Sequence, residues 1–244
     1  RVDSADTTFS AGGEVSIVLS RACAVFGANA SGKSNLIKAM AFFKWFVMNS
    51  SKDVQAGEKI PVHSFALSAS SVTEPSLFEI VILIDEDTYR YGFETSAETV
   101  HREWLYVKAG KKRSKEIELF YREENKYELH PRFSIGKELT EKNMVRDNAL
   151  LLSLAGQFND PYAGAVMKWL NDTTIIFGNS DRKIWNVAML AMENPIIRKR
   201  IVDFSRYADL GIDDIILTDK GVMTTHAQYD GEGKELASVA FSME

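Results

Sequence analysis

The stretch Gly27-Ala28-Asn29-Ala30-Ser31-Gly32-Lys33-Ser34 decides how this chain is interpreted. It fits the pattern G-x-x-x-x-G-K-[ST] at every fixed position. Glycines let the backbone curl, so that successive N–H groups point at one anion. The first turn of a following helix adds unpaired N–H donors and a partial positive charge. The sequence therefore predicts a loop that binds phosphate groups.

The segments on both sides of the loop predict the elements that such a loop joins. Residues 23–26 (Cys-Ala-Val-Phe) form a short apolar run, which predicts a strand. Residues 35–48 predict a helix, because apolar side chains recur there at helical spacing, at Leu36, Ile37, Met40, Phe43 and Val47. A strand, a glycine-bounded loop and a helix are the context in which this motif binds a nucleotide.

The residue types in the loop indicate a nucleoside triphosphate, and we expect ATP with Mg²⁺ as the cofactors. The Lys33 ammonium would reach the β- and γ-phosphates and support catalysis, and the Ser34 hydroxyl would be the protein's ligand to magnesium. The expected cofactor-binding residues are Gly27, Ala28, Asn29, Ala30, Ser31, Gly32, Lys33, Ser34 and Asn35.

The composition narrows the class of protein. The chain has 244 residues, 45% of them hydrophobic, which is enough for a sizeable core in one or two domains. The formal net charge of −5 gives no global positive field of the kind that marks a nucleic-acid binder. A single cysteine, Cys23, excludes an internal disulfide. The lone cysteine fits a reducing cytoplasm, so we expect a cytoplasmic protein. Apolar runs such as residues 78–84 are too short to cross a bilayer, so we expect no membrane partner.

Beyond the loop, the pattern predicts three segments: a nucleotide-binding lobe with a β subdomain at residues 1–150, a helical region at 151–210, and strands at 211–244. In the first segment, an antiparallel meander is expected from runs at 78–84, 89–94, 103–107, 116–122 and 126–130. After residues 150–154 the character changes to helical, and helices are expected at 163–170, 186–192 and 195–207, the last beginning at the cap-and-proline pair Asn194-Pro195.

The pair Asp85-Glu86 has two interpretations. It ends the apolar run Ile80-Val81-Ile82-Leu83-Ile84, as the acidic pair of a Walker B motif would. The residues after it, Asp87-Thr88-Tyr89-Arg90-Tyr91-Gly92-Phe93, instead look like a returning strand. We favour the hairpin turn and keep Walker B as the alternative.

The stretch GANASGKSN, in which Asn35 follows the serine, resembles the ABC-type ATPase heads of the SMC and RecF group. More closely, the chain resembles RloA-like ATP-binding proteins of bacterial phage defence. The supporting stretches are GANASGKSNLIKAM, FEIVILIDEDTYRYGFE, REWLYV and LLLSLAGQFND. This resemblance implies an α/β P-loop NTPase of the ABC-ATPase-head type, with a mixed sheet, an antiparallel meander and a helical region. It also implies that Gln157 is the Q-loop glutamine, a catalytic residue that touches the metal and the attacking water.

The resemblance further implies a head that forms a homodimer around ATP and switches a protein effector, such as a nuclease, in anti-phage defence, with DNA as a possible partner. The signature motif, Walker B, D-loop and switch histidine of such heads are not found after residue 170. We therefore expect that the C-terminal lobe is missing and that these residues alone neither hydrolyse ATP appreciably nor dimerise on adding it. Two alternatives remain: an AAA+ ring ATPase that uses Asp85 and Glu86, and a non-hydrolysing DNA-bridging scaffold controlled by ATP.

Overall fold

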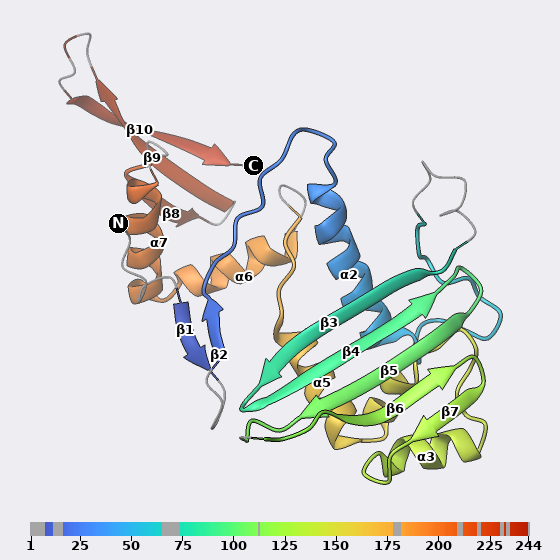
Figure 1. The fold of residues 1–244 in the computed structure, drawn as a ribbon. Helices are drawn as coiled ribbons and strands as arrows, with labels where there is room; N and C mark the ends of the chain where they lie inside the picture. Colours follow the sequence, from blue (N-terminus) through green and yellow to red (C-terminus); the bar gives the residue numbers. More distant parts are fainter. Residues whose placement is uncertain are drawn as a thin grey trace. The chain divides into compact units, whose positions relative to one another are not determined.

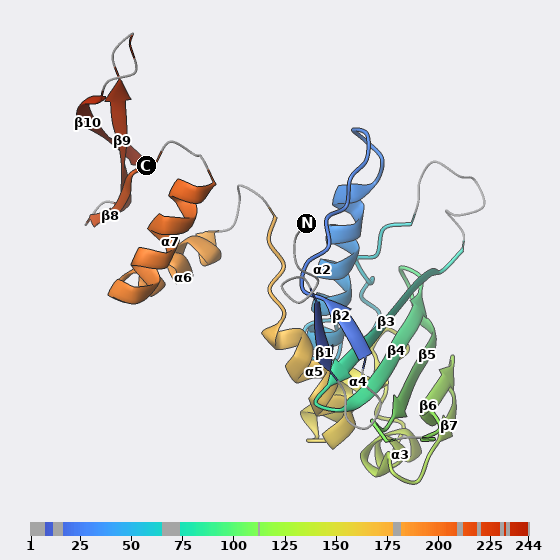
Figure 2. The same ribbon diagram turned by 60° about the vertical axis from the view of Figure 1, so that its left-hand side comes forward.

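A computed structural model describes residues 8–11, 17–64, 74–111, 113–177, 182–208, 212–218, 221–229, 232 and 235–243. The chain divides into two compact units, Arg1–Ile175 and Ile176–Glu244 (Figures 1 and 2). The first unit contains the predicted phosphate loop.

The first unit is built on a five-stranded antiparallel sheet. Its strands are β3 (Ser76–Ile84), β4 (Asp87–Thr95), β5 (Val100–Lys108), β6 (Ile117–Glu123) and β7 (Lys126–Leu129), and they lie in that order across the sheet (Figure 1). Each strand pairs antiparallel with its neighbour in sequence, because the chain reverses direction at the end of each strand. The predicted meander is confirmed.

Three helices contribute buried side chains to the core of this unit: α2 (Lys33–Asn49), α4 (Leu151–Gln157) and α5 (Pro161–Asp172). The C-terminal half of α2 packs its aromatic side chains on the sheet. The ring of Phe43 stacks on that of Phe93 at 5.3 Å, and Phe46 meets the same ring edge-on at 5.4 Å. In the N-terminal half, Leu36 and Met40 are 49% and 45% exposed. The core therefore fixes α2 by the end that lies away from the phosphate loop.

A short helix, α3 (Ser134–Glu141), follows β7 and was not predicted. It has only two large apolar residues, Ile135 and Leu139, which is too few for a periodic pattern to stand out. Burial of Leu139 in the core stabilises the helix. Tertiary contacts therefore contribute to the stability of this helix.

The strand predicted at residues 23–26 is wrong. The first two strands are β1 (Thr8–Ala11) and β2 (Ile17–Ser20), which form a separate antiparallel pair, and residues 23–26 are irregular. Val25 and Phe26 are 59% and 90% exposed. An extended segment becomes a strand only when a neighbour takes its backbone hydrogen bonds, and no described strand pairs with residues 23–26.

Every described strand pairing is antiparallel, so the parallel pairings expected of a mixed sheet are not among them.

The second unit has two helices, α6 (Arg182–Met192) and α7 (Pro195–Tyr207), and a three-stranded antiparallel sheet. The strands are β8 (Asp214–Thr218), β9 (Gly221–Tyr229) and β10 (Glu235–Met243). The predicted start of α7 is confirmed, because the Asn194 side chain accepts hydrogen bonds from the N–H groups of Ile196 and Ile197. Among the described helices of both units, none combines the length and apolar character that crossing a membrane requires.

Candidate functional site

The predicted phosphate loop is a tight turn with two residues in the left-handed backbone region. Ala30 has φ 63° and Gly32 has φ 93°, and the Ser31 N–H donates to the Ala28 carbonyl at 3.2 Å. Left-handed backbone is strained for a residue with a Cβ, and it costs Gly32 little. Alternating right- and left-handed residues turn successive N–H groups inward, which makes an anion-binding concavity. The loop is exposed to solvent.

Among the described residues, the first backbone N–H groups at the start of α2 have no hydrogen-bond partner. The helix has no side-chain cap and no acidic residue in its first turn. Asn35 and Leu36 donate their N–H groups to the Gly32 carbonyl, at 2.9 and 3.2 Å. Within the described chain, no hydrogen bond is formed by the N–H groups of Gly32, Lys33 and Ser34. These donors, at the positive end of a 17-residue helix, fit a phosphate group.

The Lys33 side chain folds back across the loop. Its ammonium donates to the carbonyl oxygens of Gly27 and Ala28, both at 2.7 Å, and lies 3.4 Å from the Ser31 hydroxyl oxygen. A β-carbon on Gly27 would come within 2.6 Å of that same hydroxyl oxygen, so the Ser31 side chain would have to move to accommodate it. Lys33 therefore holds the loop curled and adds a full positive charge to the concavity. The residues present fit a triphosphate.

Ser34 is exposed in the first turn of α2, beside the unused donors. The described residues contain no cluster of three or more His, Cys, Asp or Glu side chains that could hold a metal. Magnesium bound with a nucleotide is held mainly by phosphate oxygens and waters, and it needs few protein ligands. One hydroxyl at this position fits such an ion.

Asp85 and Glu86 form the turn of the β3–β4 hairpin, as we favoured. Ile84 pairs with Asp87, so the two acids are the turn residues, and Asp85 takes φ 53°. The turn is fixed from the side, where the Gly110 N–H donates to the Asp87 carboxylate at 3.0 Å. In both views, the turn lies well away from the start of α2 (Figures 1 and 2). This arrangement does not support the Walker B alternative.

Gln157 lies at the opposite end of α2 from the phosphate loop. Its side-chain Nε2 donates to the hydroxyl of Ser51, two residues beyond the end of α2, at 2.5 Å. Since α2 has 17 residues and an α-helix rises about 1.5 Å per residue, this contact lies about 25 Å from Ser34. The structure therefore does not bring Gln157 to the position where it would touch the metal and the attacking water.

Sequence reasoning missed the side chains that fix α2 in place. The Lys44 ammonium donates to the carbonyls of Asn171 and Thr173, at 3.1 and 2.7 Å, and ties the middle of α2 to the end of α5. The Ser51 hydroxyl lies 2.8 Å from that of Ser153 on α4. A lysine and two serines are common surface residues, and no spacing in the sequence distinguishes them.

Comparison with known families supports the interpretation of the loop. The family model described as "AAA domain, putative AbiEii toxin, Type IV TA system" matches residues 23–188, which is more than half of the 244 residues. The match includes the phosphate loop, α2, the whole five-stranded sheet and helices α3 to α5. No curated protein and no solved structure matches the chain significantly.

Proposed function

This chain belongs to the AAA domain family of that match, and from this premise we propose that it binds ATP with Mg²⁺ and takes part in hydrolysing it. The observation that carries the proposal is the set of unused N–H donors of Gly32, Lys33 and Ser34 at the mouth of a loop already curled around the Lys33 ammonium. The donors would bind the phosphate oxygens, Lys33 would counter the charge on the β- and γ-phosphates, and Ser34 would contribute a magnesium ligand.

We propose further that the chain is part of an ABC-type head that dimerises around ATP. Two features support this. The stretch GANASGKSN resembles such heads, and the phosphate loop is open to solvent, so a facing subunit could reach a bound triphosphate. Phosphoryl transfer depends on positioning and electrostatic stabilisation. In the described part of the chain, no carboxylate lies in the loop or in the first turn of α2 to position a water molecule. A facing subunit or another part of the protein would supply this group.

The resemblance to RloA-like proteins supports a role in phage defence, in which ATP-driven dimerisation switches a protein effector such as a nuclease. The competing function is a scaffold in which ATP controls assembly without being hydrolysed. Both functions need the same phosphate loop, so loop geometry does not distinguish them. A measurement of ATP turnover does distinguish them.

The experiment measures phosphate release and self-association of the protein as expressed from its gene, with ATP, with ADP and without nucleotide. Lys33→Ala is the matched variant. The proposal expects ATP-dependent association and turnover, both lost in Lys33→Ala. ATP-dependent association without turnover would favour the scaffold. ATP binding that produces neither would contradict the ABC-type dimer.

A further inference from the structure

The β7 strand is an open edge of the five-stranded sheet. It pairs with β6, with Leu129 opposite Phe120 and Lys126 opposite Glu123, and with no other described strand. The His130 N–H donates to the Leu119 carbonyl at 2.9 Å in the same register. Since hydrogen-bonded and non-hydrogen-bonded pairs alternate in an antiparallel ladder, the N–H and C=O groups of Tyr127 and Leu129 point away from β6. Within the described chain, these outward groups have no hydrogen-bond partner.

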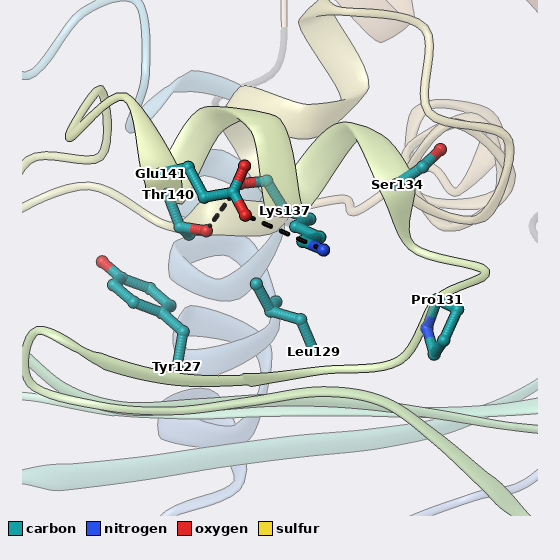
Figure 3. A pocket seen from close by; sticks show the side chains of 7 residues that line it. All are labelled: Tyr127, Leu129, Pro131, Ser134, Lys137, Thr140 and Glu141. Atoms are coloured by element: carbon teal, nitrogen blue, oxygen red, sulfur yellow. Dashed lines mark hydrogen bonds and ion pairs between the residues drawn. The ribbon is translucent and has the colours of Figure 1, made fainter.

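A groove runs along this edge, between β7 and α3 (Figure 3). Its volume is about 670 Å³, and it is lined by Tyr127, Leu129, Pro131, Ser134, Lys137, Thr140 and Glu141. The side chains of Tyr127 and Leu129 project from the strand toward the helix. On the helix side, Lys137 and Glu141 form an ion pair at 3.8 Å. Space therefore remains beside β7, under α3, for the side chains of an added strand.

The opposite face of β7 carries Lys126 and Glu128, both exposed. These two charges make the strand complementary to itself. If a second β7 ran antiparallel with Tyr127 opposite its own equivalent, each Lys126 would face Glu128 of the other copy. That pair would be of the non-hydrogen-bonded type, in which opposing side chains are closest. Shifting the register to place Glu128 opposite Glu128 would instead set two like charges against each other.

We propose that a second copy of this chain docks on β7, by antiparallel pairing of the two strands about a two-fold axis at Tyr127. The outward N–H and C=O groups of Tyr127 join the two sheets, and the Lys126–Glu128 pairs fix the register. Such a contact uses the same patch on both copies, which is the arrangement of most homodimers. It also covers an edge that is otherwise an open template for strand addition. The contact requires no nucleotide and does not depend on the proposed function.

The test is sedimentation velocity of the 244-residue chain without nucleotide, with charge-reversal variants. Lys126→Glu and Glu128→Lys should each weaken self-association at least tenfold, because each sets like charges opposite one another. An equal mixture of the two variants should associate as the wild type does, because every facing pair is again of opposite sign. Both sites are exposed on a hairpin, and circular dichroism checks that the variants stay folded. Because association is measured without nucleotide, a failed ATP proposal leaves this test intact.

Three outcomes would overturn the proposal: a wild-type chain that stays monomeric at its highest soluble concentration, single variants that associate as the wild type does, or a mixture that does not recover. If the wild type is monomeric but an added extended peptide protects the Tyr127 and Leu129 amides from hydrogen exchange, the edge binds a different partner, and the self-docking proposal is equally overturned. Recovery in the mixture alone supports direct pairing of Lys126 with Glu128 across copies.

Discussion

The Glu103 carboxylate and the Arg122 guanidinium face each other at 3.7 Å in the interior of the first unit, and neither side chain is exposed. Glu103 accepts hydrogen bonds from the N–H groups of Leu151 and Leu152 at the start of α4, and from the Tyr91 hydroxyl. Arg122 donates to the Ala149 carbonyl at 2.7 Å, just before α4. The pair thus joins the sheet to α4, the helix that contacts the end of α2 through Ser51.

We expect Glu103→Gln and Arg122→Met to destabilise the first unit by about 3–5 kcal/mol each, because either change leaves a buried charge without its partner. Chemical denaturation measures the free energy of unfolding. The matched control is Arg102→Met, whose exposed guanidinium pairs with Glu94 and Glu123 on the same sheet and should contribute little. Equal effects at Arg102 and Arg122 would contradict a structural role specific to the buried pair.

Gly92→Ala should destabilise the sheet by about 1–3 kcal/mol, through overpacking. A β-carbon at Gly92 would lie 2.6 Å from the Trp104 ring and 2.8 Å from the Phe78 carbonyl oxygen. The control is Gly164→Ala in α5, where an added β-carbon meets nothing within 4 Å. That change should stabilise by about 0.5–1 kcal/mol, because alanine favours a helix. Thermal unfolding measures the stability of both variants. A Gly92→Ala variant as stable as the wild type would contradict the close approach of Trp104.

Asp85→Asn combined with Glu86→Gln should leave ATP turnover within a few-fold of wild type, because the two acids form a hairpin turn away from the phosphate loop. The assay is steady-state phosphate release. A loss of several orders of magnitude with normal ATP binding would mean that the pair anchors magnesium and water. The AAA+ ring interpretation would then replace the ABC-type head.

The Tyr106 hydroxyl should lose its proton at a higher pH than an unperturbed tyrosine, whose pKa is 10.0. Partial burial and a hydrogen bond from its hydroxyl to Glu118 raise its pKa from 10.0 to about 12. Because the folded pKa lies above the unfolded one, this contribution to stability is complete below pH 10 and is lost as the pH rises toward 12. Phenolate absorbance compared between wild type and Tyr106→Phe measures the pKa. The free energy of unfolding should fall less steeply between pH 10 and 12 in the variant. Ionisation of Tyr106 near 10 would contradict the burial and hydrogen bond.

The parts predicted well from the sequence are those fixed by local chemistry. The start of α7 follows from its Asn194 cap and Pro195, and the β3–β4 hairpin follows from two acids between two strand-like runs. The position of the phosphate loop ahead of α2 follows from its motif, since few other residues give that turn.

The parts that could not be predicted depend on distant neighbours. Residues 23–26 have strand composition, but without a pairing partner they remain irregular. Glu103 and Arg122 occupy inward positions that a binary pattern assigns to apolar residues, and only their mutual pairing and the start of α4 make that burial possible. The place of Gln157 depends on how α4 meets the end of α2, a contact between residues 106 positions apart.

The central claim is that the loop ahead of α2 binds the triphosphate of ATP. Titration calorimetry of the wild type and Lys33→Ala with Mg²⁺–ATP tests it most directly, and circular dichroism confirms that both remain folded. We predict that the wild type binds and that Lys33→Ala binds at least tenfold more weakly, because the ammonium no longer counters the β- and γ-phosphate charge at the mouth of the loop. Equal affinity in the two proteins, or no binding by the wild type, would contradict the account.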